Sequence, residues 1–270
     1  MAIYTLMPLH ECLGLAVIGV DLRAPIDAET AEGFSRLLAE HLVLVFPEQV
    51  LTATQYLAAA ASFGAPMREH ASPRPLPDFP HIGLAWTDIG ESPGRGWHSD
   101  HVDRAQPPAA TLLFGVETPS AGGGISIADM RAAYWSLPDD ERLRLEGMHW
   151  VHRAAPSSNA EEAGAADDET PAAHPAVRTH PVSRERAIYL RAGAAISIAG
   201  MTQAASQAYL ADLDHRMIQP EFVYNHSWRK GDVVVIDDRA TLRRVDADYP
   251  AGENRILWRI YVEGERPVFR

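Results

Sequence analysis

The stretch Trp97-His98-Ser99-Asp100 holds an imidazole and a carboxylate two positions apart. Because the side-chain period of a strand is two, an H-x-D triplet at a strand end places both groups on the same side. His98 and Asp100 can therefore bind one metal ion from one edge. Such a triplet occurs often by chance, so its meaning depends on the rest of the chain.

Helical and strand patterns lie on both sides of this triplet. The sequence predicts helices over residues 28–41, 52–63, 128–137, 139–145 and 202–217. It predicts strands over residues 42–46, 82–86, 110–116, 187–190, 222–226, 233–236 and 256–262. Early helices followed by many short strands favour an α+β protein whose core is a β-sandwich or a small barrel.

The composition limits the classes of function. The chain has 270 residues, with 24 Lys and Arg against 36 Asp and Glu, and its net charge of −12 argues against a nucleic-acid partner. A hydrophobic share of 46% indicates a real core, and the single Cys12 excludes an internal disulfide or a cysteine zinc cluster. No stretch is long and apolar enough to span a membrane, and the first residues do not resemble a signal peptide. We therefore expect a cytoplasmic protein with no membrane partner.

The domain organisation follows from the absence of any linker-like stretch. We expect one domain over residues 1–270, with an acidic insertion at residues 157–173. The insertion has five acidic residues between Glu161 and Glu169 and no large apolar side chain, so it is predicted to be a mobile loop.

Ordered motifs along nearly the whole chain resemble those of the taurine/2,4-dichlorophenoxyacetate dioxygenase family, which are iron(II)- and 2-oxoglutarate-dependent oxidoreductases. The matching segments are residues 19–22, 44–46, 49–52, 63–64, 97–100, 122–123, 128–134, 174–181, 219–224 and 231–232, together with His226, Trp228, Asp237, Arg239, Leu242, Arg244, Arg255 and Arg259. The resemblance implies a double-stranded β-helix, or jelly-roll, core with flanking helices. It also implies iron(II) and 2-oxoglutarate as cofactors, and a small acidic organic molecule as substrate.

The metal site that the resemblance implies is a facial triad of two His and one carboxylate. His98 and Asp100 match the first two ligands. The third should come from a segment resembling W-D-N-R-x-x-L-H-R, which here reads Ile236-Asp237-Asp238-Arg239-Ala240-Thr241-Leu242-Arg243-Arg244. Arg243 therefore stands at the distal histidine position. A guanidinium stays protonated and has no lone pair for iron, so iron binding is doubtful.

The cosubstrate pocket shows a second departure. Where the resemblance implies a Thr that helps to hold the distal carboxylate of 2-oxoglutarate, the chain has Ile125 in the run Gly122-Gly123-Gly124-Ile125. Arg255, which pairs with that carboxylate in the family, is present. Arg259 and His70 match positions that contact the substrate. Since arginine binds carboxylate and sulfonate oxygens in pairs, an anion pocket is expected to remain.

Two functional hypotheses follow. The first is a dioxygenase with an altered metal site. The second is a metal-free homologue, acting as a partner subunit of a catalytic protein or as an enzyme of non-redox chemistry; a homo-oligomer also stays open. Without iron, Asp100 would leave a buried negative charge, which needs a cation. We therefore predict that Arg243 forms a salt bridge with Asp100.

Overall fold

The structure is a computed structural model that describes residues 4–68, 75–86, 96–152, 172–190, 196–246 and 248–270. The helices are α1 (Ala28–His41), α2 (Ala53–Ala61), α3 (Met130–Ser136), α4 (Asp139–Glu146), α5 (Gln203–Met217) and the short 3₁₀ helix η2 (Pro220–Phe222). The strands are β1 (Thr5–Pro8), β2 (Leu15–Ile18), β3 (Val43–Phe46), β4 (Pro75–Leu76), β5 (Phe79–Trp86), β6 (Ala110–Glu117), β7 (Ile125–Asp129), β8 (His149–His152), β9 (Ala172–Pro175), β10 (Val177–Thr179), β11 (Arg186–Ile188), β12 (Ile196–Ile198), β13 (Val223–His226), β14 (Val233–Asp237), β15 (Thr241–Val245) and β16 (Ile256–Val262).

The central element is an eight-stranded sheet with the order β1-β2-β3-β14-β6-β16-β5-β4. Strand β14 lies in the middle of this sheet and is apolar on both faces. Val234 and Ile236 pack into a cluster shared with a second sheet, while Val233 and Val235 pack into a cluster under α1 and α2. A strand that is covered on both sides reads as a continuous hydrophobic run, since both alternate faces are buried.

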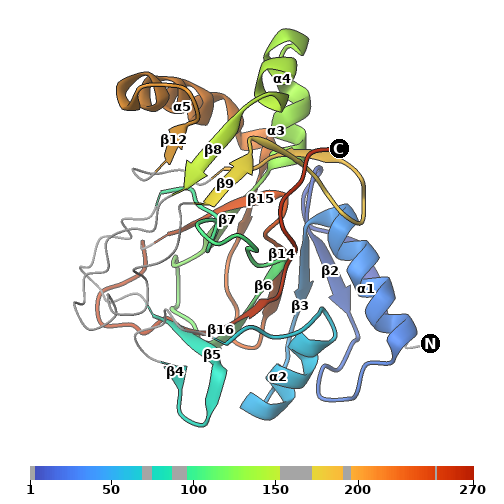
Figure 1. Ribbon diagram of the computed structural model, residues 1–270. Coiled ribbons are helices and arrows are strands. Elements are labelled where there is room, and N and C mark those ends of the chain that lie inside the picture. The colour runs from blue at the N-terminus through green and yellow to red at the C-terminus, as the bar shows by residue number, and fades with distance from the viewer. Residues whose placement is uncertain (1–3, 69–74, 87–95, 153–171, 191–195, 247) are drawn as a thin grey trace.

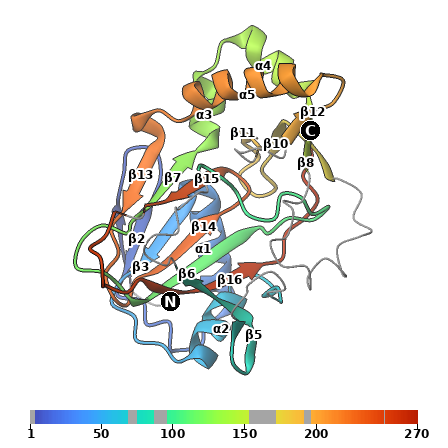
Figure 2. The same cartoon turned by 90° about the vertical axis from the view of Figure 1, so that its left-hand side faces the viewer.

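The second sheet has the order β13-β7-β15 and lies against the large one. Ile125 and Ile127 of β7 and Leu242 of β15 pack into the cluster that the two sheets share. Figures 1 and 2 show α3, α4 and α5 gathered at the end of the molecule opposite α2. Two facing sheets with flanking helices confirm the α+β, jelly-roll prediction.

Several element boundaries differ from the prediction. Residues 128 and 129 end strand β7, so helix α3 begins only at Met130, where the Asp129 carboxylate accepts hydrogen bonds from the backbone N–H groups of Arg131 and Ala132. Strand β15, which carries Arg243, was not predicted, because its Arg-Arg pair hides the alternation of buried and exposed positions. Both errors concern short strands whose burial depends on the opposing sheet.

The acidic insertion predicted at residues 157–173 lies outside the described residues up to position 171. Its last two residues, Ala172 and Ala173, begin strand β9. Among the described helices, none is both long enough and apolar enough to cross a membrane.

Candidate functional site

Arg243 is placed by strand pairing on both sides of β15. In the small sheet it lies opposite Ile127 of β7. On its other side it forms an isolated antiparallel bridge with His98, in which the two residues exchange backbone hydrogen bonds of 2.8 and 2.9 Å. The jelly-roll fold predicted from the sequence requires His98 and Arg243 to lie within about two strand spacings of each other, and this bridge agrees with it.

The guanidinium of Arg243 is held between two carboxylates. Its Nη2 donates to Oδ2 of Asp100, and its Nη1 donates to Oδ1 of Asp238 at 2.6 Å. Nη1 also lies 3.2 Å from the hydroxyl oxygen of Thr111, which in turn donates to Asp238 at 2.5 Å. The side chain of Arg243 is only 5% exposed. The predicted salt bridge with Asp100 is therefore confirmed, and Asp238 is a second counter-charge that was not predicted.

The turn between β14 and β15 fixes Asp238. Asp237, which is fully buried, receives two hydrogen bonds from the Arg239 guanidinium and lies 3.0 Å from Nε2 of His180. The hydroxyl of Thr241 donates to the backbone oxygen of Asp237 at 2.7 Å. These contacts hold the turn in one conformation, so the carboxylate of Asp238 faces Arg243.

The charges of the network are stabilised mutually. Burial alone would raise the pKa of Asp100, but the charges of Arg243, His98 and Arg259 and the hydrogen bond from Tyr261 together outweigh burial and hold that pKa well below its usual range. Burial raises the pKa of Asp238 to about 6, and the charge of Arg243 limits that rise. Burial alone would lower the pKa of Arg243, but the two carboxylates raise it instead. All three groups are therefore charged at neutral pH.

His98 and Asp100 lie on the same side, as predicted, but Asp100 lies in a turn and not in a strand. Asp100 begins a turn, and the hydroxyl of Tyr261 donates to the same Oδ2 that Arg243 contacts. His101, which strand alternation would point away, has a left-handed backbone (φ 53°), and its ring meets that of Tyr261 edge-on at 4.7 Å. His98 Nε2 lies 3.6 Å from Oδ1 of Asp100, and its Nδ1 lies 2.8 Å from the backbone oxygen of Gly96.

These residues do not fit the iron site that the sequence resemblance implies. A facial triad needs three lone-pair donors on one side of the ion, and a guanidinium offers only N–H donors. In the described part of the chain, no group of three His, Cys, Asp or Glu side chains is placed to hold a metal ion. Oδ2 of Asp100 is already bonded to two donors, one of them a fixed cation.

Arg255 forms a second part of the site, directly before β16. The residue is 2% exposed, its Nε donates to the backbone oxygen of Gly123 at 2.7 Å, and its Nη2 has no hydrogen-bond partner among the described residues. Burial lowers the pKa of Arg255 to about 10. A buried cation with an unpartnered N–H group is costly, so this guanidinium is suited to receiving an anion.

The other residues that the sequence resemblance assigns to the pocket, and Gly123 beside Arg255, lie as follows. Gly123 has a left-handed backbone (φ 64°), and a Cβ there would lie 3.1 Å from Cδ of Arg255. Ile125 is buried in the core between the sheets, so it offers no hydroxyl to a ligand. Arg259 stacks over the ring of Tyr261 at 4.7 Å, and its charge lowers the pKa of Asp100. His70 lies outside the described residues.

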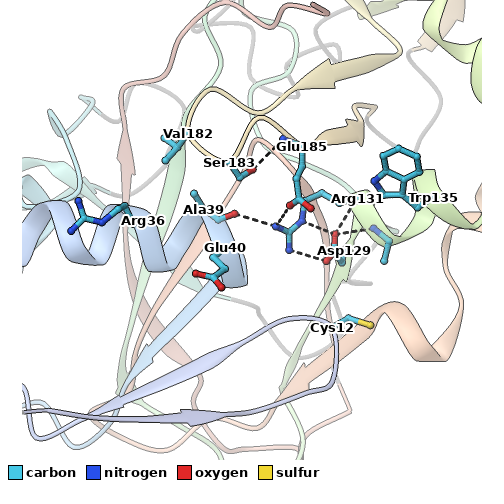
Figure 3. Close-up of a pocket in the computed structure, with 11 residues that line it drawn as sticks. Cys12, Arg36, Ala39, Glu40, Asp129, Arg131, Trp135, Val182, Ser183 and Glu185 are labelled. Carbon is cyan, nitrogen blue, oxygen red and sulfur yellow. Dashed lines mark hydrogen bonds and ion pairs between the residues drawn. The ribbon is translucent and has the colours of Figure 1, made fainter.

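A cavity of about 670 Å³ lies elsewhere, between α1, α3 and the turn after β10 (Figure 3). Its buried arginine, Arg131, is neutralised by Asp129 and by Glu185 at 2.7 Å, and it also donates to the backbone oxygen of Ala39. This cluster joins α3 to α1. Its charges are satisfied within the protein, which indicates a structural role.

Comparison with known proteins places this geometry in a family. Residues 5–261 match the family model described as "Taurine catabolism dioxygenase TauD, TfdA family". The chain belongs to the TauD, TfdA family.

Relatives of the TauD, TfdA family align over nearly the whole chain. The chain is 33% identical over 262 residues to the alpha-ketoglutarate-dependent 2,4-dichlorophenoxyacetate dioxygenase of Cupriavidus pinatubonensis, covering 88% of this chain and 90% of the relative. It is 30% identical to a taurine dioxygenase structure from Burkholderia xenovorans, with a TM-score of 0.87 and coverage of 98% and 91%. The structure of AAD-2 in complex with Mn(II) and N-oxalylglycine gives a TM-score of 0.82 at 30% identity, with coverage of 98% and 99%.

Three residues that contact Asp100 or Arg243 in this member of the TauD, TfdA family were not predicted from the sequence. Asp238 could have been found, since it stands where the resembling segment has Asn, five positions before Arg243. Tyr261 shares the inward face of β16 with Arg259, so strand alternation could have indicated it. Thr111 gave no signal of its own, because a buried Thr in a strand is usually only a packing residue.

Proposed function

We propose that this protein is a TauD, TfdA family member that binds a small organic acid in a pocket around Arg255 and has an impaired metal site, in which Arg243 takes the place of the iron. The single observation that carries the proposal is the guanidinium of Arg243 held between Asp100 and Asp238. The impairment is thus more than a missing ligand, since an internal cation neutralises the carboxylate that iron would need.

The contact with Asp238 supports a fixed position of the Arg243 guanidinium at the metal site. One arginine facing Asp100 alone would form a simple pair, whereas a second carboxylate with its own Thr111 hydrogen bond fixes the guanidinium at both ends. Paired hydrogen bonds to two ions fix direction as well as distance. Releasing Arg243 toward solvent would leave Asp238 buried without an ion pair and would remove the cation bonded to Asp100, so the residue is not expected to swing aside for a metal ion.

The acid pocket is supported by Arg255. Its Nη2 is buried without a hydrogen-bond partner among the described residues, and burial outweighs the influence of Asp246 on its charge. The relatives are named for alpha-ketoglutarate and for acidic substrates, including a sulfate ester dioxygenase of Pseudomonas putida at 30% identity. We infer that a carboxylate, sulfonate or sulfate group of a small molecule pairs with Arg255, with Arg259 and His70 as further substrate contacts.

Two roles are consistent with acid binding without iron chemistry. The protein is either an enzyme of non-redox chemistry or a partner subunit of a catalytic protein. The competing candidate, an active iron- and 2-oxoglutarate-dependent dioxygenase, is favoured by the names of the relatives and by the presence of Arg255. It requires Arg243 to leave Asp100 when iron binds.

A thermal-shift series with 2-oxoglutarate, succinate and taurine tests the acid pocket. We expect at least one acid to raise the melting temperature of the wild type in a saturable way, and Arg255→Ala to abolish that response. Arg244→Ala is the matched control, because Arg244 is half exposed and pairs with Asp246 on the surface. No response to any acid, or an equal response in Arg255→Ala, would contradict the pocket.

A further inference from the structure

A second arginine cluster lies in a cavity of about 360 Å³ that shares none of the residues described above for the Arg243 network or for Arg255. The arginine cavity, as we call it, is lined by Arg178, Arg184, Arg266 and Arg270, with Glu265 as the carboxylate among its lining side chains. The protein as a whole carries a net charge of −12. A concentration of positive charge in such a protein needs a specific explanation.

The floor of the arginine cavity is a buried cation. Arg178 is 2% exposed, its Nη2 donates to Oε1 of Glu265, and its guanidinium lies 4.9 Å over the ring of Tyr189. Its Nε has no hydrogen-bond partner among the described residues. A buried guanidinium N–H without an acceptor is uncommon in proteins, and here the same side chain lines an open cavity. Arg178 therefore contributes a buried positive charge to the lining of the cavity.

The rim of the cavity adds charge that Glu265 does not neutralise. Arg184 and Arg266 are exposed, and neither forms an ion pair within the described part of the chain. By contrast, the buried Arg131 of the larger cavity in Figure 3 is matched by two carboxylates. Two rim arginines above a buried one present several N–H donors to a common space, which is the arrangement that suits a phosphate group.

The walls of the cavity are built from fixed backbone. The C-terminal segment lies along β10, with the Thr179 N–H donating to the backbone oxygen of Val268 at 2.8 Å. The turn that carries Arg184 is held by His180, whose Nδ1 accepts from the backbone N–H groups of Val182 and Ser183 at 3.3 and 3.1 Å. Arg184 itself has a left-handed backbone (φ 64°). Such strained positions persist where the surrounding structure fixes them, and functional sites are often among them.

We propose that the arginine cavity is a binding site for a phosphate group, as inorganic phosphate or as the phosphate monoester of a small molecule. A guanidinium pairs two N–H donors with two phosphate oxygens, and three arginines can surround a tetrahedral oxyanion. The cavity volume leaves room for a small organic group attached to the phosphate. This site is separate from the acid pocket, and it does not depend on the state of the metal position.

Calorimetric titration of the full chain with inorganic phosphate and with glycerol phosphate tests the proposal, with sodium chloride of equal ionic strength as the reference. We expect saturable binding of at least one phosphate compound, and tighter binding of glycerol phosphate would identify the ester as the natural form. Replacing one rim arginine by Gln, as in Arg184→Gln or Arg266→Gln, should weaken binding about tenfold, the effect of losing one charged hydrogen bond.

Two control variants locate the binding. Arg36→Gln removes an exposed arginine of α1 that pairs with Glu32, and it should leave phosphate affinity unchanged. Arg255→Ala should abolish the response to organic acids and keep the response to phosphate, so that the two pockets succeed or fail separately. The proposal is overturned if phosphate heats match those of chloride, or if Arg184→Gln and Arg266→Gln bind phosphate as the wild type does.

Discussion

The substitution Arg243→Met removes the internal cation and keeps a side chain of similar length. It takes the guanidinium away from the side chains of Asp100 and Asp238, which are 10% and 2% exposed. Asp238 then has no other ion pair among the described residues, and Asp100 keeps only the weaker influence of His98 and Arg259. Breaking a buried ion pair by removing one partner costs about 3–5 kcal/mol, because the other charge stays buried and unpaired. Two carboxylates are affected here, so we expect a loss of at least about 4 kcal/mol in the free energy of unfolding. In a chain of this size that corresponds to a fall of roughly 10 °C in Tm.

The assay is urea unfolding at neutral pH, with Arg244→Met as the matched control. Arg244 is the next residue on β15, its side chain is 46% exposed, and its pair with Asp246 spans 3.2 Å. An exposed pair contributes about 1 kcal/mol or less, so the control should differ little from the wild type. The triple variant Arg243→Met/Asp100→Asn/Asp238→Asn removes both carboxylate charges and should recover at least half of the loss. A loss of under about 1 kcal/mol in Arg243→Met would show that Arg243 does not neutralise buried charge, and would refute the reasoning.

Three further predictions concern the rest of the site. Arg255→Met removes a buried cation whose pKa is lowered to about 10, and urea unfolding should show a stability equal to or above that of the wild type; a large loss would mean that Arg255 has a structural partner. Gly123→Ala places a Cβ on a residue with a left-handed backbone, 3.0 Å from Cγ of Pro119, and should lower the free energy of unfolding by of order 1–3 kcal/mol and weaken acid binding. A variant with the stability and acid affinity of the wild type would contradict this close approach. Burial alone would raise the pKa of Asp237, but Arg239 and His180 lower it, so the carboxylate's contribution to stability is complete above the unfolded pKa of about 3.9 and is lost as the pH falls below that value. Unfolding measured at pH 7, 4 and 3 should therefore show a smaller loss of stability in acid for Asp237→Asn than for the wild type. An equal loss in the two proteins would refute the assignment.

The outline of the fold could be predicted from the sequence because its apolar runs are strong. The strands β14 and β6 are continuous hydrophobic stretches, and helix α1 has the predicted bounds, with the Asp27 carboxylate as its N-cap. Strand β15 could not be predicted, since Arg243 is buried where an apolar residue normally marks an inward face, and the next residue, the exposed Arg244, has the same side chain. The burial of Arg243 depends on two carboxylates, Asp238 in the preceding turn and Asp100 at 143 positions' distance, and no local hydrophobic pattern records either of them.

The candidate site could be predicted in part. Arg243 and Asp100 are 143 positions apart in the chain, yet their salt bridge could be predicted. The family resemblance placed Arg243 at the site of the third metal ligand, and the buried charge of Asp100 needed a cation there. The turn at Asp100 and the left-handed His101 were not predictable from alternation, because a turn interrupts the strand period directly after Ser99. The arginine cavity was also hidden, since its arginines come from β10, the following turn and the C-terminal segment, which meet only in the fold.

The central claim is that Arg243 takes the place of the metal ion, and titration of the purified protein with iron(II) under argon tests it most directly. The wild type is predicted to show no saturable binding, whereas Arg243→His/Asp238→Asn, which restores the His and Asn that the family resemblance implies at these two positions, is predicted to bind one iron per chain. Saturable binding of one iron per chain by the wild type, lost in Asp100→Asn, would contradict the claim and make this protein an iron-dependent member of its family.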